Sequence, residues 1–222
     1  MKKRKNIITV AIDSPAAAGA GTQAKLIAKH YNLLQLDTGR IYRLIGKLRL
    51  ENPDKFNYLI IRNKIKNLRI NDLKKKGLLT DKVAVSASII ARDKKIRDIV
   101  LKFQQRYAYN PPKKYAGSVL DGRDITSVIL KDAMFKFFIT ANIKTRAKRR
   151  FKEYKNQNKR ISYNEVLKSL KNRDKSDRLR KHGPLKKTKD SILLNSTKLS
   201  RKQCFLKIKT IMDNKLKLNG SI

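Results

Sequence analysis

A loop of small residues follows the first apolar run of the sequence and has the composition of a phosphate-binding turn. The run at residues 7–12 is β-rich, as is typical of a strand buried on both faces, and Thr22 opens a helical pattern. Glycines let successive backbone N–H groups of such a loop point at one anion, and the helix N-terminus adds its positive dipole end. A threonine hydroxyl at the start of the helix can also bind Mg²⁺. The candidate loop reads Ser14, Pro15, Ala16, Ala17, Ala18, Gly19, Ala20, Gly21, Thr22.

This loop departs from the G-x-x-x-x-G-K-[ST] pattern at two positions that matter. Ser14 stands in place of the first glycine, and Ala20 stands in place of the lysine. Thr22 comes one residue later than the pattern asks, a spacing also seen in nucleotide kinases that read G-K-G-T. Taken alone, the match is weak, because such a loop is more often a tightly packed strand-to-helix turn with no ligand.

Arginine and aspartate groups farther along the chain could bind phosphate. Guanidinium groups bind phosphate oxygens bidentately and stay charged, and phosphoryl transfer depends on positioning and on cations around the transferring group. The groups are residues 121–124, 146–150 and 173–180. Each also has a plain structural interpretation: the first could be a turn, the second a solvated helix face, and the third an i, i+4, i+7 ladder of salt bridges.

Apolar runs alternate with helical patterns along the chain, which predicts an α/β fold with a parallel sheet and helices on both faces. The predicted strands are 7–12, 33–36, 118–120, 135–139 and 192–194. The predicted helices are 40–50, 56–69, 83–105 (one long helix or two abutting ones), 144–154, 164–179 and 201–215. The length fits a single domain over residues 1–222.

Composition excludes some classes and leaves one question open. The single cysteine, Cys204, cannot form an internal disulfide and fits a reducing compartment, and no apolar run is long enough to span a membrane. We therefore expect a cytoplasmic protein without a membrane partner. The net charge of +39 raises nucleic acid as a partner, but the basic residues are spread along the whole chain. Compositional drift together with an anionic small substrate is the favoured interpretation.

Seven segments resemble, in order and at compatible distances, motifs of bacterial cytidylate kinases. The resemblance covers roughly residues 7–215 and is weakest between residues 50 and 82. The matching segments are Val10–Pro15 with the loop after it, Leu36–Arg43, the Ser88, Arg97 and Gln104 positions, Asp121–Asp124, Arg146–Arg150, Arg173–Arg180 and Leu194–Thr197.

The resemblance implies the P-loop nucleoside monophosphate kinase fold, with a central five-stranded parallel sheet flanked by helices. It implies a nucleoside monophosphate (NMP)-binding region at about residues 38–105 and a lid at about residues 153–163. The implied reaction transfers the γ-phosphoryl group of ATP to CMP or dCMP with Mg²⁺. The implied protein is a monomer whose partners are these small molecules.

Site residues carry over position by position. Arg43 and Arg97 would hold the CMP phosphate, with Arg123 and Arg180 near it. The sugar and the cytosine would be read by Thr38, Tyr42, Ser88, Asp124 and Asp177. The ATP side would be formed by residues 14–22 and Arg146, the catalytic residues would be Arg150, Arg173 and Asp121, and Mg²⁺ would be held by Thr22 and, through a water, by Asp121.

Ala20 leaves the activity open at this point. Lys25 or a lid arginine could replace the missing cation, or the chain could be a lapsed relative that still binds nucleotides. A nucleic-acid-binding protein on the same scaffold and a P-loop kinase for another small molecule are further alternatives. We favour a working, slow kinase, because every other site position of the resemblance is present.

Overall fold

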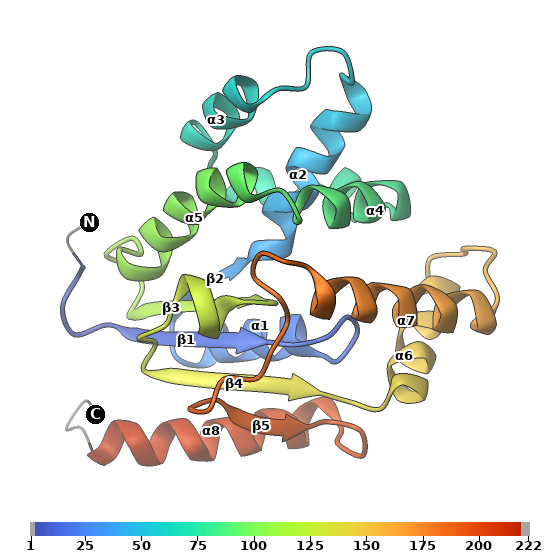
Figure 1. Ribbon diagram of the computed structural model, residues 1–222. Helices are drawn as coiled ribbons and strands as arrows, with labels where there is room; N and C mark the ends of the chain where they lie inside the picture. The colour runs from blue at the N-terminus through green and yellow to red at the C-terminus, as the bar shows by residue number, and fades with distance from the viewer. Residues whose placement is uncertain (1–2, 219–222) are drawn as a thin grey trace.

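A parallel sheet forms the centre of the molecule. In this computed structural model, which describes residues 3–218, five strands pair in parallel in the order β2-β3-β1-β4-β5 (Figure 1). The strands are β1 (Ile8–Asp13), β2 (Leu33–Asp37), β3 (Gly117–Gly122), β4 (Phe135–Thr140) and β5 (Ile192–Asn195). The predicted five-stranded α/β sheet is confirmed, and the predicted strands differ from these only at their ends.

Helices cover both faces of the sheet, because alternate side chains of each strand point to opposite sides. On one face, Val10 and Phe137 pack with Met212 in a core that includes the helices α1 and α8. On the other face, Ala11 and Leu120 pack with the helices that follow β2. The bounds are α1 (Ala20–His30) and α8 (Arg201–Leu218). Cys204 is buried in the first core.

The segment between β2 and β3 forms a group of helices that stands above the sheet in Figure 1. Its helices are α2 (Thr38–Glu51), α3 (Tyr58–Lys66), α4 (Asp81–Ile90) and α5 (Lys94–Tyr109). The pattern at 83–105 is two helices, because Asp93 caps α5 by accepting a 3.1 Å hydrogen bond from the Ile96 amide. The helix predicted at 56–69 ends early at Lys66 and gives way to two 3₁₀ turns, Ile70–Lys74 and Lys76–Leu79.

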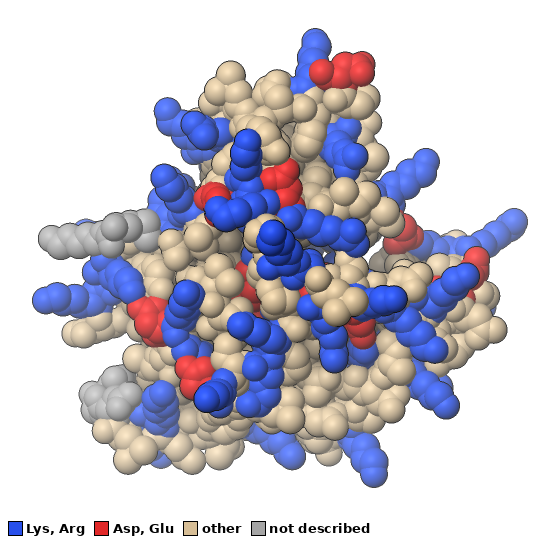
Figure 2. Space-filling model, viewed as in Figure 1, with Lys and Arg blue, Asp and Glu red and all other residues tan. Residues whose placement is uncertain are grey.

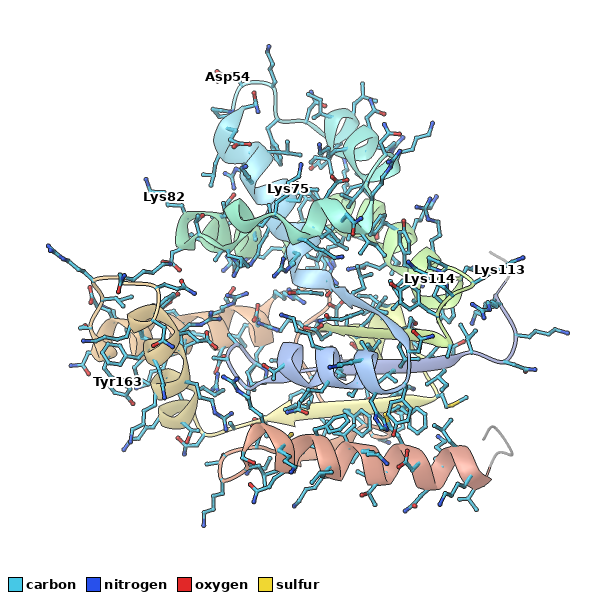
Figure 3. All side chains as sticks on the ribbon, turned by 180° about the vertical axis from the view of Figure 1, so that it is seen from behind. Asp54, Lys75, Lys82, Lys113, Lys114 and Tyr163 are labelled. Carbon is cyan, nitrogen blue, oxygen red and sulfur yellow. The ribbon has the colours of Figure 1, made fainter. Side chains whose placement is uncertain are left out.

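A helical hairpin follows β4. It consists of α6 (Ile143–Lys155), the α6–α7 loop (residues 156–162) and α7 (Tyr163–Leu179). Ser162 and Glu165 form a reciprocal capping box at the start of α7. Ala147 and Val166 pack with Ala16 of the β1–α1 turn, so this small core joins the hairpin to the candidate phosphate loop. Figure 3, drawn from behind, shows the hairpin (marked by Tyr163) at the opposite end of the molecule from Lys113 and Lys114.

The basic side chains are dispersed. Figure 2 shows Lys and Arg scattered over the visible face, with Asp and Glu between them. Within residues 3–218, none of the helices combines the length and the apolar character needed to cross a lipid bilayer.

Candidate active site

The turn between β1 and α1 wraps the N-terminus of α1. Gly19 is the N-cap and has φ 98°, a left-handed conformation that glycine adopts readily. Ala17 is also left-handed, with φ 60°, although its Cβ makes this cost about 1 kcal/mol. Ser14 anchors the turn by donating its amide to the Gly122 carbonyl at 3.2 Å. The turn is therefore held in a fixed shape beside the end of β3.

Two arginines of α6 brace this turn through its carbonyl groups. Arg146 donates to the Ala16 carbonyl at 3.1 Å and binds both carboxylate oxygens of Asp174, at 3.1 and 2.6 Å. Arg149 donates to the Ser196 hydroxyl at 3.0 Å, and that hydroxyl donates to the Ala18 carbonyl at 3.0 Å. Arg146 is buried, so this part of the basic run is no solvated helix face. Asp174 directly follows Arg173 in the sequence. Its ion pair with Arg146 could not be predicted from the sequence.

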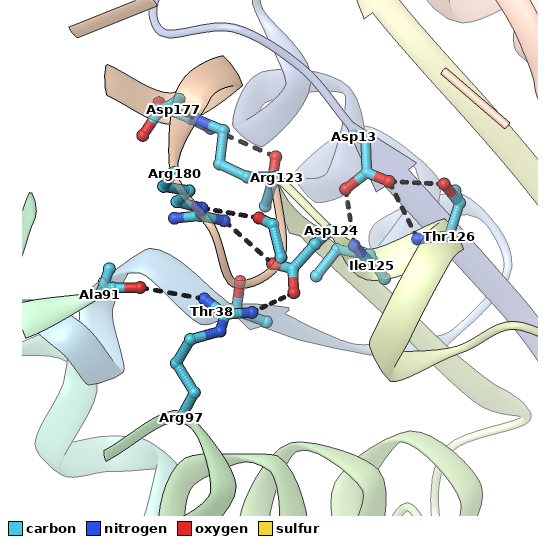
Figure 4. Close-up of polar contacts among 12 residues, drawn as sticks. Asp13, Thr38, Ala91, Arg97, Arg123, Asp124, Ile125, Thr126, Asp177 and Arg180 are labelled. Carbon is cyan, nitrogen blue, oxygen red and sulfur yellow. Dashed lines mark hydrogen bonds and ion pairs between the residues drawn. The ribbon is translucent and has the colours of Figure 1, made fainter. Parts of the chain in front are cut away.

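Asp13 fixes the segment that follows β3. Its buried carboxylate accepts hydrogen bonds from the Ile125 amide (2.7 Å), the Thr126 amide (2.9 Å) and the Thr126 hydroxyl (2.6 Å) (Figure 4). Burial raises the pKa of Asp13 to about 6 against the effect of these bonds. Sequence reasoning missed this role, and the signal was an aspartate that ends an otherwise apolar strand. Asp13 thus sets the backbone path of the candidate site at residues 121–124.

Two carboxylates lie side by side at the carboxyl ends of β2 and β3. Asp37 and Asp121 are register partners, and Gly21 of α1 faces Asp121 closely: a Cβ built on it would lie 3.5 Å from Oδ2. Burial, followed by the charge of Asp37, raises the pKa of Asp121, and the ammonium of Lys25 acts in the opposite direction. The Thr38 hydroxyl donates to the Asp121 carbonyl at 2.9 Å. This pair offers hard oxygen ligands next to the phosphate loop.

A buried ionic group lies where α5, α7 and the end of β3 meet. Arg97 forms an ion pair with Asp124, and Arg180 lies 3.3 Å from the other oxygen of that carboxylate (Figure 4). Arg180 also donates to the Gly183 carbonyl at 2.6 Å. Burial raises the pKa of Asp124, although both arginines oppose the shift. The three predicted residues therefore meet at one point.

Beside this group lies a small cavity of about 50 Å³. Its lining includes Tyr42, Arg97 and Gln104, and the Arg97 guanidinium lies 5.9 Å from the centroid of the Tyr42 ring. Gln104 is buried, and its Nε2 has no hydrogen-bond partner among residues 3–218. Ser88 lies half-buried on α4, and its hydroxyl has no hydrogen-bond partner within this described part of the chain.

Arginines from four elements converge near the end of β3. Arg123 Nε donates to Asp177 at 2.6 Å, and Arg173 Nε lies 3.9 Å from the same oxygen. Burial, followed by the charge of Arg123, lowers the pKa of Arg173 to about 10, and Arg43 and Arg150 lower it further. Arg43 donates to the Leu78 carbonyl at 2.9 Å. We call Arg43, Arg123, Arg150 and Arg173 the arginine cluster.

The charges of this cluster do not balance. Asp177 is its buried carboxylate, and Arg123 and Arg173 lower the pKa of Asp177 although burial alone would raise it. The other three arginines of the cluster each lower the pKa of Arg173, because like charges repel. Mutually repelling guanidinium groups fixed in one place form a site that an anion would stabilise.

Comparisons with known proteins agree with one another. Residues 10–214 match the protein-family model described as cytidylate kinase. The cytidylate kinase of Bartonella bacilliformis is 37% identical over 221 residues, covering 98% of this chain and 100% of the relative. The cytidylate kinase of Fusobacterium nucleatum is 38% identical over 204 residues, covering 87% of this chain and 91% of the relative.

A solved structure supports the fold independently. The crystal structure of an uncharacterized protein from Eubacterium ventriosum superposes with a TM-score of 0.56 at 17% identity. It covers 93% of this chain and 98% of that protein. At this identity the likeness concerns the fold alone.

Proposed function

We propose, from the premise that this chain belongs to the cytidylate kinase family, that it transfers the γ-phosphoryl group of ATP to CMP or dCMP at the site described above. The chain is an ATP-dependent phosphotransferase by its family, and the products of this reaction are CDP or dCDP. One observation carries the detailed proposal. The buried ionic group of Arg97, Asp124 and Arg180 lies beside the arginine cluster, which carries an excess of positive charge. A nucleoside monophosphate has the matching polarity, with an uncharged base at one end and an anion at the other.

We assign recognition of the cytosine base to Asp124. A carboxylate accepts a hydrogen bond from the exocyclic amine of cytosine, whereas uracil carries a carbonyl oxygen at that position. Arg97 is held by Asp124 and packs against Tyr42, so we place Arg97 at the base and not at the phosphate. Thr38, Ser88, Asp177 and Arg180 would surround the sugar and the base.

We assign the transferring phosphate to the arginine cluster. Phosphoryl transfer builds charge on the equatorial oxygens, and preorganised cations stabilise that charge without moving. Arg173 is the strongest candidate, because its buried Nε has no hydrogen-bond partner among residues 3–218. Arg43 and Arg150 approach it from α2 and α6, and Arg123 from the end of β3.

We assign the ATP phosphates to residues 14–22, with Arg146 in support. Backbone amides at the start of α1 face the anion, and Arg146 holds the turn by its Ala16 carbonyl. The donor set here fits Mg²⁺: the Thr22 hydroxyl and the Asp121 carboxylate, acting through a water, are hard oxygen ligands. Asp37 raises the pKa of Asp121, and a bound divalent cation would relieve this repulsion. When bound, Mg²⁺ neutralises charge on the phosphate oxygens.

Lys25 is our candidate to replace the lysine that is missing at position 20. The Ala20 side chain is buried in the core with Ala24 and Ile27. Lys25 lies one turn after Gly21 on the same face of α1, and helical side chains lean toward the N-terminus. Lys25 is exposed, and its charge lowers the pKa of Asp121. Lys25 and the arginine cluster together would supply the positive charge.

Steady-state phosphorylation of CMP, dCMP, UMP and AMP tests the proposal. We further propose residues 38–105, which carry Thr38, Arg43 and Arg97, as the NMP-binding region, and residues 153–163, which follow Arg150 in the α6–α7 hairpin, as the lid.

A further inference from the structure

Asp81 joins the α6–α7 hairpin to the helices that bind the monophosphate. Tyr154 donates its hydroxyl to Asp81 Oδ1 at 2.8 Å, and Lys159 donates to Asp81 Oδ2 at 2.8 Å. Asp81 is the first residue of α4, whereas Tyr154 lies in the last turn of α6 and Lys159 lies in the α6–α7 loop. Both carboxylate oxygens are thus bound from a segment more than 70 residues away in sequence.

Tyr154 also lies between two cations. The Arg150 guanidinium lies 5.7 Å from the centroid of the Tyr154 ring, and the Lys159 ammonium lies 4.6 Å from it. Aromatic faces attract such cations electrostatically. Tyr154 therefore links Asp81 to Arg150, a member of the arginine cluster.

The segment that carries Asp81 also holds Arg43. Arg43 donates to the carbonyls of Leu78 (2.9 Å) and Thr80 (3.4 Å), and Thr80 is the N-cap of α4. Arg150 in turn lowers the pKa of Arg43, so the two guanidinium groups are close enough to repel each other. Residues 78–81 thus hold Arg43 directly and contact Tyr154, beside whose ring Arg150 lies while it pairs with Glu153 at 3.1 Å.

The contact lies at one side of the molecule. In Figure 1 the α6–α7 hairpin reaches toward α4, and Figure 3, drawn from behind, labels Lys82 at the start of α4 on that side. Arg92 adds a second contact between the same two regions by donating to the Ser176 hydroxyl at 2.8 Å. Asp81 itself belongs to the stretch that resembles cytidylate kinases least.

We propose that Asp81 is a positioning residue that fastens the lid to the monophosphate-binding region through Tyr154 and Lys159, so that Arg43 and Arg150 reach the transferring phosphate together. The inference rests on the proposed function, because it needs a phosphate between these arginines. It goes beyond that function, because it assigns a positioning role to Asp81, Tyr154 and Lys159, which the proposed function does not use. We call the contact of Asp81 with Tyr154 and Lys159 the lid clasp.

Kinetics of conservative variants test the lid clasp. Asp81→Asn keeps the shape and removes the ion pair with Lys159, and Tyr154→Phe keeps the ring and removes the hydroxyl. We expect each to lower kcat/KM for CMP about tenfold, since each removes one charge-assisted hydrogen bond. The double variant should lose less than the product of the two, because both residues act through one contact. Asp190→Asn, which removes an equally exposed carboxylate far from the clasp, is the control and should match the parent.

A distance measurement tests the clasp without relying on turnover. Spin labels at Val85→Cys on α4 and Gln157→Cys on the α6–α7 loop, in a Cys204→Ala background, report the separation of the two regions. We expect one short distance in the parent and a second, longer population after Asp81→Asn. Parent-like distances in Asp81→Asn overturn the clasp, whether or not the protein phosphorylates CMP. Absent turnover in the parent with a lengthened Asp81→Asn distance would instead refute the proposed function and leave the clasp standing.

Discussion

Arg97 and Asp124 form an ion pair that is buried beneath the backbone of Gly183. The side chains of both residues are less than 10% exposed, and a Cβ on Gly183 would overlap the Arg97 guanidinium and the Asp124 carboxylate. Arg180 completes the group by contacting Asp124 and the Gly183 carbonyl. The pair is therefore positioned from three segments that are distant in sequence.

Asp124→Asn should narrow the preference for CMP over UMP. The amide keeps the shape of the carboxylate, but it presents a donor where the amine of cytosine needs an acceptor. We expect kcat/KM for CMP to fall about 10²-fold and that for UMP to change little. The ratio of the two kcat/KM values is the measurement, with a urea titration to establish that the variant is folded. An unchanged ratio would remove Asp124 from base recognition.

Gly183→Ala should weaken CMP binding and the fold together. Gly183 has φ +59°, a conformation in which an added Cβ costs about 1–2 kcal/mol, and that Cβ would displace Arg97. We expect KM for CMP to rise several-fold and the free energy of unfolding to fall by that amount. Gly77→Ala is the matched control, because its Cβ would meet just the flexible end of Lys47 at 3.4 Å. Equal behaviour of the two variants would contradict the role of Gly183.

The sequence was sufficient for the sheet and for the turn of small residues between β1 and α1. Continuous apolar runs such as Val10–Ile12 can be buried on both faces only in a strand between two helical layers. The loop after it was recognisable because small residues cluster between a strand and a helix. Both are local properties of the chain.

The tertiary partners could not be predicted. Whether Asp13 faces the amides of Ile125 and Thr126, or Asp81 faces Lys159, depends on how distant segments pack. The same limit applies to Arg97, whose ion pair with Asp124 could not be predicted from the sequence. Helix bounds between residues 56 and 93 also deviated, because tertiary contacts override weak local propensity there.

Arg173→Met should separate catalysis from stability. Arg173 is a half-buried cation beside other arginines, and its surroundings lower its pKa to about 10. We expect kcat to fall about 10²- to 10³-fold, the usual loss for one preorganised charge, while Tm stays equal or rises. Arg178→Met, an exposed residue on the same helix, is the control for the change in charge. Parent-like kcat in Arg173→Met would exclude it from the transition state.

Asp121→Asn should make the protein more stable at neutral pH and inactive. Folding raises the pKa of Asp121 from 3.8 to about 8, so the folded state binds more protons than the unfolded state between these values. Stability contributed by the protonated carboxyl is therefore present below pH 3.8 and is lost as the pH rises toward about 8. Unfolding of parent and variant from pH 4 to pH 8 should show a difference that grows with pH.

Mg²⁺ provides the second readout of the same variant. It should raise the Tm of the parent at pH 8, where Asp121 is most ionised, and should raise that of Asp121→Asn less. A stability difference that is flat with pH, together with equal Mg²⁺ effects, would show that Asp121 is neither strained nor a metal ligand.

Steady-state phosphorylation of CMP, dCMP, UMP and AMP by Mg-ATP, with Ala20→Lys run in parallel, tests the central claim most directly. We predict turnover in the parent that is selective for CMP and dCMP, because Lys25 and the arginine cluster supply the charge that position 20 lacks. Turnover that is absent from the parent and restored by Ala20→Lys would contradict that replacement. Silence in both proteins would contradict the kinase itself.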